Sequence, residues 1–296
     1  MGDTMAKTLD EGFNTFLNWL IPLSSENDKV VSHKDSVYSC LNTKHKCYEL
    51  FETGSYGSGT GIRHYSDTDY FAAIPAMELY DNSGYSLRKI KESLQETFWS
   101  TEGIAVKCPA VCIPFGNYAS ETMEVSPCYF SELLDTPLGK YPAYRIADCN
   151  DGWMLSSPKA HKAYVEKQDS RLSFSVKKLI RLVKAWKYYN DVPILSFYLE
   201  LRVTKYAEGE NCILYDIDLK RFLKWLLDND LPSIQDPMGI SGLVFACSTS
   251  AKRTETISKL TTAVSRAENA VSCRDNDIDT AFYYWNLLFN GEFPAR

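Results

Sequence analysis

The sequence predicts an α+β protein in two parts, a mixed sheet with flanking helices followed by an all-helical lobe. Strand-like stretches occur before Pro158, and from there apolar residues recur at helical spacing. Hydrophobic residues make up 45% of the 296 residues and charged residues 24%, the composition of an ordinary globular protein, which argues against disordered and fibrous classes. We therefore expect two lobes that meet near residues 150–158.

The elements of the first lobe follow from local patterns. Helical spacing of apolar residues, as in Val37, Leu41 and Phe51, indicates helices. Shorter apolar runs separated by turn-forming pairs such as Gly116-Asn117 favour strands. The expected helices are 5–21, 29–51 and 85–99, and the expected strands are 67–74, 104–115, 121–130 and 141–147, with a glycine- and serine-rich loop at 54–61.

The second lobe is expected to contain helices alone. Lys177, Arg181 and Lys184 share one face of a helix, opposite an apolar stripe that includes Leu179 and Trp186. A basic face of this kind either binds an anion or is simply solvated. The expected helices of this lobe are 171–190, 194–207, 217–229, 253–272 and 277–289.

The charge of the chain and its apolar segments exclude several classes of protein. The 32 Lys and Arg against 38 Asp and Glu give a net charge of -6, which argues against a protein that coats nucleic acid. The apolar stretch at 16–23 is interrupted and well short of the roughly 20 residues that a membrane span needs. No secretory signal is visible at the N-terminus, so we expect a cytoplasmic protein without a membrane contact.

Nine cysteines are scattered along the sequence in no clear grouping. In a chain without a secretory signal, an odd and unclustered set predicts reduced, buried thiols. Cys108 and Cys112 have no second Cys/His pair at zinc-finger spacing, so no structural zinc is expected.

The loop at 54–61 and the two aspartates that follow it carry the most chemical information. Four glycines in eight residues allow the backbone to turn tightly and to point N–H groups at an anion, although the Gly-Lys-Ser/Thr of a P-loop is missing. Asp67 and Asp69 lie two apart, so a strand places both carboxylates on one face. The apolar run 70–74 leads this strand into a core, where two charges are costly unless a cation compensates them. The pattern predicts a site for two Mg²⁺ ions.

These residues resemble a known signature. Gly54-Ser55, Gly59-Thr60 and Ser66-Asp67-x-Asp69 look like the motif of the DNA polymerase β-like nucleotidyltransferase superfamily. Within it the chain is most similar to the cGAS/DncV-like nucleotidyltransferases, bacterial enzymes that make cyclic oligonucleotide second messengers in anti-phage (CBASS) defence. The resemblance runs from about residue 50 to 272. It implies a bilobed fold, with a catalytic lobe at 1–155, a helical nucleotide-binding lobe at 156–296 and an N-terminal helix that packs across both.

The resemblance also implies a third carboxylate on a later strand. The matching segment is Glu124-Val125-Ser126-Pro127, where the family more commonly has Asp, and Glu121 is the alternative. This carboxylate would act as the base that activates the attacking hydroxyl or as a ligand of the metal that does so.

In the second lobe the resemblance rests on 179–187 followed by 194–200. It implies that Lys184 and Ser196 contact the triphosphate of the donor nucleotide and that Phe197 stacks on its base. Ser196 is equally compatible with a plain helix-start hydroxyl. His161 is expected to pack or hydrogen-bond rather than to catalyse, and Asp236-Pro237 is expected to serve the architecture.

The resemblance therefore implies a nucleotidyltransferase that makes a cyclic di- or trinucleotide. Asp67, Asp69 and Glu124 would hold two Mg²⁺ ions, with Mn²⁺ as the alternative metal, and Gly54-Ser55 would grip the phosphates. Two other functions stay open: transfer to another acceptor (a linear oligoadenylate, a tRNA end or a small molecule), and a non-catalytic binding module. The expected partners are nucleoside triphosphates and an unidentified activating protein or ligand. Zinc-dependent DNA sensing is not expected, and the chain is expected to be a monomer.

Overall fold

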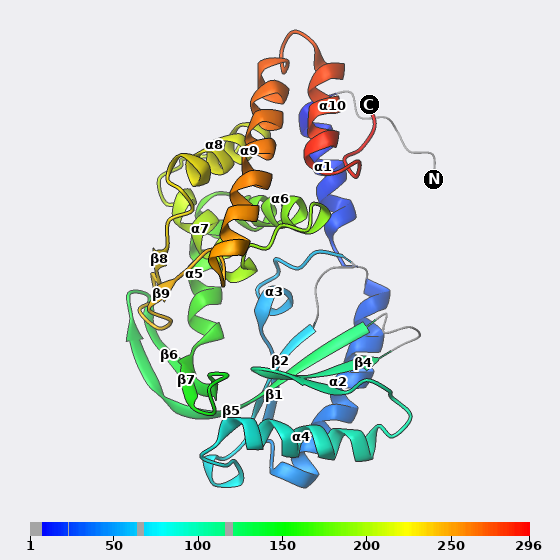
Figure 1. The fold of residues 1–296 in the computed structure, drawn as a ribbon, viewed down its shortest axis with the longest axis vertical. Helices are drawn as coiled ribbons and strands as arrows, with labels where there is room; N and C mark the ends of the chain where they lie inside the picture. Colours follow the sequence, from blue (N-terminus) through cyan, green and yellow to red (C-terminus); the bar gives the residue numbers. More distant parts are fainter. Residues whose placement is uncertain (1–7, 23, 64–67, 116–120) are drawn as a thin grey trace.

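The computed structural model describes residues 8–22, 24–63, 68–115 and 121–296. Figure 1 shows a sheet with its helices in the lower part and a helical part above it. Seven strands form one mixed sheet, and the described chain beyond residue 157 is helical apart from one short hairpin, so the predicted α+β fold is confirmed.

The large sheet comprises β1 (Glu49–Glu52), β2 (Thr68–Ala73), β3 (Ala105–Lys107), β4 (Ala110–Phe115), β5 (Glu121–Thr136), β6 (Gly139–Ala147) and β7 (Trp153–Ser156). The helices of the first part are α1 (Leu9–Leu20), α2 (Ser24–His45), α3 (Gly54–Gly57), the 3₁₀ turn η1 (Ala76–Glu78) and α4 (Ser83–Thr97). The second part contains α5 (Pro158–Arg171), α6 (Val176–Tyr189), α7 (Ser196–Ala207), α8 (Tyr215–Asp228), the hairpin β8 (Ile234–Gln235) and β9 (Leu243–Val244), α9 (Ser250–Ser272) and α10 (Ile278–Leu288).

The long strand β5 organises the sheet. Its first half lies between β2, to which it is parallel, and β4, to which it is antiparallel, and its second half pairs with β6. The strands β1 and β3 complete this part of the sheet beside β2 and β4, and β7 pairs with β6. The parallel pairing of β2 with β5 brings the ends of two strands that are distant in sequence to the same place.

The faces of β2 follow the period of two that a strand imposes. Tyr70 and Ala72 belong to the core that α2 and α4 cover with residues such as Leu41 and Ile90. Phe71 belongs to a smaller cluster on the opposite face, with Cys128 and Tyr144 among its other members. Odd-numbered positions of β2 therefore face away from α2 and α4.

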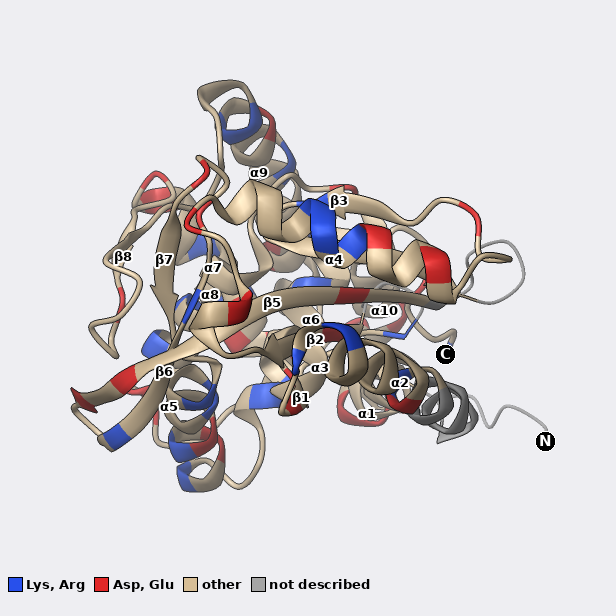
Figure 2. Cartoon of the chain, turned by 90° about the horizontal axis from the view of Figure 1, so that it is seen from below, with Lys and Arg blue, Asp and Glu red and all other residues tan. Residues whose placement is uncertain are grey.

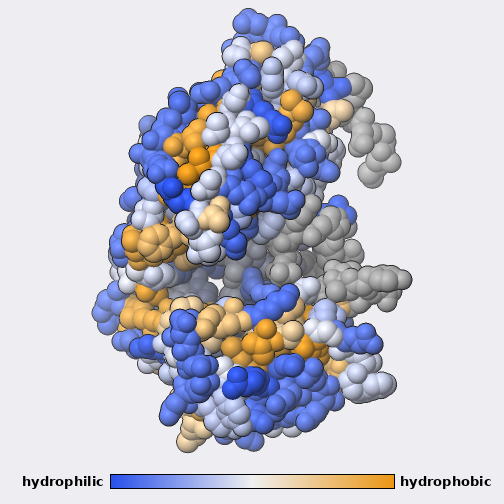
Figure 3. Space-filling view, in the orientation of Figure 1, coloured by the Kyte–Doolittle hydropathy of each residue, from blue (hydrophilic) through white to orange (hydrophobic). Residues whose placement is uncertain are grey.

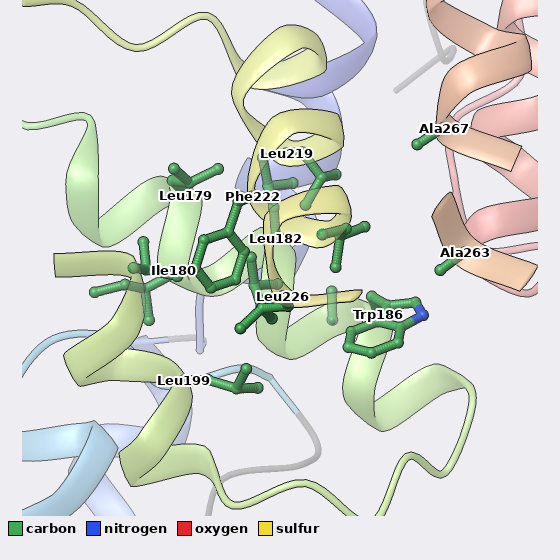
Figure 4. Packing of buried hydrophobic residues seen from close by; sticks show 14 of the residues in the cluster. Leu179, Ile180, Leu182, Trp186, Leu199, Leu219, Phe222, Leu226, Ala263 and Ala267 are labelled. Atoms are coloured by element: carbon green, nitrogen blue, oxygen red, sulfur yellow. The ribbon is translucent and has the colours of Figure 1, made fainter. Parts of the chain in front are cut away.

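The helical part has its own larger core. Figure 4 shows side chains from α6, α8 and α9 converging, including Leu182, Phe222 and Ala263. Helix α1 also belongs here, because its Phe13 packs edge-on against Trp285 and its Phe16 packs against Phe289 at a tilt, with ring centroids 5.1 and 4.5 Å apart. The next helix, α2, contacts α4 and the first strands instead. The division into 1–155 and 156–296 stays a prediction.

Several elements differ from the sequence-based expectation. The helix expected to reach residue 51 ends at His45, where Lys46 takes a positive φ of 57°, and the pairing of Leu50 with Ala72 makes the following residues a strand. The expected strand 104–115 is the hairpin β3–β4, which contains a cis Cys108-Pro109 peptide. Helix α5 was not predicted because its sequence is mostly polar, and β7 and the β8–β9 hairpin were too short to predict.

The prediction of nine reduced, buried thiols is wrong. Cys108 and Cys149 form a disulfide that joins the β3–β4 turn to the β6–β7 turn, two segments that only the folded sheet brings together. Of the free cysteines, Cys212 is exposed and two others are half-buried. Among the helices of the described residues, none is both long and apolar enough to cross a membrane.

Candidate functional site

Two carboxylates meet at the floor of a cleft between the sheet and the helical part. Asp69 on β2 is the direct register partner of Glu124 on the parallel strand β5. Both line a cleft of about 800 Å³, as do Phe71 and Ser126 two residues further along each strand. Since neighbouring strands lie about 4.8 Å apart, the two carboxylates stand side by side on one face. Asp67 and the side chain of Glu121 lie outside the described residues.

Gly54 lies directly against the Asp69 carboxylate. The backbone N–H of Thr53 donates to the Asp69 carbonyl over 2.8 Å, which joins the end of β1 to β2. Gly54 then begins α3 with a φ of +57°, and a Cβ at this position would lie 1.9 Å from Asp69 Oδ2. Both the backbone angle and the close approach therefore require glycine here.

The basic face of α6 holds the rest of the glycine-rich segment through hydrogen bonds. The Arg181 guanidinium donates to the carbonyls of Gly59 and Gly61 over 2.7 and 3.3 Å. Lys184 Nζ donates to the carbonyl and hydroxyl of the fully buried Thr60 over 3.4 and 3.2 Å. This basic face is therefore used largely for backbone and side-chain contacts within the protein.

Lys184 itself is 1% exposed and is not among the described residues that line the cleft. Its ammonium group forms an ion pair with Glu200 of α7, whose carboxylate also accepts a hydrogen bond from Thr60 Oγ1 over 2.6 Å. Glu200 does line the cleft. The structure thus places Lys184 in the layer behind Glu200 and does not bring it beside Asp69 and Glu124.

The two predicted site residues at the start of α7, Ser196 and Phe197, have different surroundings. Phe197 is 38% exposed and lines the cleft. Ser196 accepts a hydrogen bond from Lys187 Nζ over 2.6 Å and lies 3.3 Å from the Tyr188 hydroxyl. Burial, together with the nearby charge of Lys184, lowers the pKa of Lys187 to about 8. Sequence reasoning missed Lys187 because its hydrogen bond depends on how α6 meets α7.

Other residues of the cleft were missed as well. Lys159, His161 and Lys162 on the first turns of α5 line it, as do Ile240, Ser241 and Leu243 of the β8–β9 hairpin. A usable signal was the local charge, because residues 159–187 contain nine Lys and Arg but two Asp and Glu. Figure 2 shows these basic residues interleaved with acidic ones along α5. Figure 3 shows the molecule hollowed between its lower and upper halves, with hydrophobic residues beside the hollow.

The chemistry of the described donors fits a divalent metal ion. Carboxylate oxygens are the ligands that Mg²⁺ prefers, and Asp69 and Glu124 supply two from adjacent strands. The missing Cβ of Gly54 leaves the space that Asp69 Oδ2 occupies. Within the described residues no group of three or more His, Cys, Asp or Glu is placed to hold a metal, and Asp67 is not among those residues.

Comparisons with known proteins identify a family and a fold for the chain. Residues 7–169 match the family described as the Second Messenger Oligonucleotide or Dinucleotide Synthetase domain. No curated protein sequence is a significant match. The match to this family spans more than half of the chain.

Solved structures match over most of the chain. CdnC from E. coli MS115-1, in a complex with HORMA-deltaN, is 15% identical, with 96% of this chain and 98% of that chain covered and a TM-score of 0.75. The Elizabethkingia meningoseptica CdnE cyclic dinucleotide synthase, with GTP and Apcpp, is 18% identical, with 84% and 96% covered and a TM-score of 0.62. The Vibrio cholerae DncV cyclic AMP-GMP synthase, in complex with a linear intermediate, is 16% identical, with 83% and 69% covered and a TM-score of 0.65.

At these identities the structural likeness shows the fold, a polymerase β-like nucleotidyltransferase fold. The match over residues 7–169 shows the family. The chain therefore belongs to the Second Messenger Oligonucleotide or Dinucleotide Synthetase family, as its resemblance to the cGAS/DncV-like nucleotidyltransferases predicts.

Proposed function

We propose that the protein is a nucleotidyltransferase that joins nucleoside triphosphates into a cyclic di- or trinucleotide second messenger, in the cytoplasm of a bacterium defending itself against phage. The observation that carries this proposal is the register pairing of Asp69 with Glu124 at the floor of the cleft, with Gly54 packed on Asp69. The cleft volume of about 800 Å³ is in the range that small-molecule ligands fill.

Asp69 and Glu124, together with Asp67, would hold two Mg²⁺ ions, with Mn²⁺ as the alternative. The bound metal would neutralise phosphate charge and lower the pKa of the attacking ribose hydroxyl. Gly54 and Ser55 would bind the phosphates of the donor nucleotide through backbone N–H groups and the Ser55 hydroxyl. Glu124, next to Asp69 in the sheet, orients the acceptor hydroxyl or accepts its proton.

The helical part would hold the remainder of the donor nucleotide. Phe197 offers an aromatic face at the wall of the cleft, on which the base stacks. Ser196, with Lys187 bonded to it, contacts the triphosphate. Lys184 contributes through its contacts with Thr60 and Glu200, because these fix the glycine-rich segment.

Incubating purified protein with Mg²⁺ and pairwise labelled triphosphates tests the proposal. We expect pyrophosphate release and a phosphatase-resistant product, which mass spectrometry identifies. Asp69→Asn should lower the rate at least about a hundredfold, since metal–ligand charge stabilisation is worth several kcal/mol. Asp67→Asn together with Asp69→Asn should abolish turnover and leave the fold intact. The matched control is Glu132→Gln, an exposed carboxylate further along β5, which should keep the wild-type rate.

The same product analysis separates the alternatives. A linear oligoadenylate, or a nucleotidyl group on tRNA or a small molecule, would identify a different acceptor. Unchanged function after mutation of both aspartates would identify a non-catalytic binding module. CdnC was solved in complex with HORMA-deltaN. A HORMA-type protein is therefore the first activator to add if the purified chain alone makes no product. Absence of product from all four triphosphates with that activator would contradict the proposal.

A further inference from the structure

His161 connects three elements at the wall of the cleft. It lies on the first turn of α5, three residues after Pro158, and lines the cleft. Its Nε2 is 2.8 Å from Asp236 Oδ2 beside the β8–β9 hairpin. Its ring meets Phe197 of α7 edge to face, with the centroids 4.9 Å apart and the planes at 77°.

Asp236 fixes the tautomer of this histidine. Its carboxylate is buried and accepts the backbone N–H groups of Met238, Ile240 and Ser241 over 2.9, 3.1 and 2.8 Å. Burial alone would raise the pKa of Asp236, but the hydrogen bond from His161, the charge that this ring carries when it is protonated, and the backbone hydrogen bonds outweigh burial and hold the pKa well below its usual range. An ionised carboxylate only accepts hydrogen bonds, so Nε2 of His161 carries the proton.

Nδ1 is therefore the remaining polar atom of the ring. In the neutral imidazole it is a hydrogen-bond acceptor, because the proton sits on Nε2. Among the described residues the single hydrogen-bond partner of the His161 side chain is Asp236. Phe197, which contacts the ring, and Ile240 and Ser241 line the same cleft as His161. A nucleobase stacked on Phe197 would lie beside Nδ1 of His161, and the hydrogen bond of Nε2 with Asp236 fixes the orientation of this acceptor.

We infer that His161 determines base specificity: its Nδ1 accepts a hydrogen bond from the exocyclic amine of the base that stacks on Phe197. The inference rests on the proposed function, because it names the class of nucleotide which that site prefers. ATP and GTP both carry an exocyclic amine, and ITP carries none. In adenine the amine is a donor at the position where hypoxanthine has an acceptor oxygen.

Equilibrium binding separates this inference from the proposed function. The probes are the 2′,3′-dideoxy forms of ATP, GTP and ITP, which lack the attacking hydroxyl, titrated calorimetrically into the full chain with Mg²⁺. We expect at least one of the amino-bearing nucleotides to bind wild type about tenfold more tightly than ITP, the contribution of one hydrogen bond. Equal affinities for all three would overturn the inference and leave the proposed function standing. No binding of any of the three would count against the proposed function itself.

Two substitutions distinguish the roles of the two ring nitrogens of His161. His161→Gln keeps an N–H donor near the position of Nε2 and removes the acceptor at Nδ1. His161→Asn keeps an acceptor near Nδ1 and cannot reach Asp236. If Nδ1 reads the base, His161→Gln binds ITP as tightly as the amino-bearing nucleotide and unfolds at the wild-type urea concentration. His161→Asn loses stability because Asp236 loses its partner. A His161→Gln variant that keeps the full preference over ITP would show that the histidine is merely structural and would overturn the inference.

Discussion

At the scale of single residues, the Asp69 carboxylate lies where a side chain at position 54 would begin. Substituting Ala for Gly54 places a methyl group 1.9 Å from Asp69 Oδ2 and requires a φ of +57°, so the carboxylate has to move. Because a misplacement of about 1 Å in a catalytic group can cost about a hundredfold, we expect Gly54→Ala to lower the rate of pyrophosphate release by that order.

The control for this substitution is Gly291→Ala. Gly291 also has a positive φ, +92°, but a Cβ there has open space around it. Gly291→Ala should lose about 1–3 kcal/mol of unfolding free energy in urea titrations, since alanine is strained at positive φ. Gly54→Ala should lose at least as much, because the Asp69 carboxylate also has to move. If the two variants lost activity equally, the contact with Asp69 would not explain the need for glycine.

Lys187 gives a second prediction at this scale, which concerns pH. Its pKa in the folded protein, about 8, lies below the value of about 10.4 for an unfolded lysine. Between these values the unfolded chain holds more protons, so the free energy of unfolding rises with pH through this window. Below about pH 8 the lysine is protonated in both the folded and the unfolded chain, so the free energy of unfolding does not rise with pH there. Urea titrations at about pH 7.5 and about pH 10 should show wild type gaining stability relative to Lys187→Met.

Lys178→Met is the matched control for Lys187→Met, because Lys178 is an exposed lysine of the same helix α6. Its stability difference from wild type should stay constant across the same pH range. A constant difference for Lys187→Met too would show that the lysine is not desolvated.

The sequence indicated several residues that line the cleft, but it did not show how the others are held, for a physical reason. The period of a strand and the resemblance placed Asp69 and Glu124 where the sheet pairs them. Phe197 was expected to face the nucleotide, and it lines the cleft. Lys184 was expected to do the same, and its ion pair with Glu200 could not be predicted because it depends on where α6 meets α7. Helical spacing shows which residues share a face but not what covers that face.

At the scale of elements, α6 and α7 hold the glycine-rich segment through the group formed by Lys184, Glu200 and Thr60. Removing one partner of a buried ion pair leaves the other charge uncompensated. We therefore expect Lys184→Met to lower the unfolding free energy by about 3–5 kcal/mol in urea titrations. The double variant Lys184→Met with Glu200→Met should recover most of this loss, because no buried charge then lacks a partner.

Lys205→Met is the matched control for the lysine substitution. Lys205 pairs with Glu208 on the surface of α7, and its side chain is 54% exposed. Exposed ion pairs contribute at most about 1 kcal/mol, so this variant should differ little from wild type. Equal losses for Lys184→Met and Lys205→Met would contradict the role given to the buried group.

The elements that the sequence failed to predict share one property: tertiary contacts decide their conformation. The chain after Cys47 continues the apolar spacing of a helix and becomes β1 because β2 offers it a sheet edge. Helix α5 has a mostly polar sequence and is held by its contacts with α6, α7 and β6. The β8–β9 hairpin is short, and it is stabilised by the backbone hydrogen bonds that Asp236 accepts.

At the scale of the whole molecule, the N-terminal segment belongs to both parts. Helix α1 buries Phe13 and Phe16 in the helical core, and α2 packs on the sheet side. Phe16 is 1% exposed, and its ring packs against those of Phe289 and Phe293. Phe16→Ala should cost about 3–5 kcal/mol of unfolding free energy in urea titrations, through lost burial and the cavity it leaves.

Phe174→Ala is the control for this substitution, since Phe174 is 66% exposed and its removal leaves no cavity. It should change the unfolding free energy by less than about 1 kcal/mol. If Phe16→Ala were equally mild, α1 would not be an integral part of the helical core.

The disulfide also determines the effect of proteolytic cleavage on the protein. Cys108 and Cys149, separated by 41 positions, close a covalent ring that contains all of β4, β5 and β6 and therefore Glu124, while Asp69 lies outside it. A protease that cleaves one bond within the ring leaves a single covalent molecule. It separates into two fragments on a denaturing gel only after a thiol reductant has opened the ring. Nicked protein can thus keep β2 beside β5, and the cleft with them, although its polypeptide is no longer continuous.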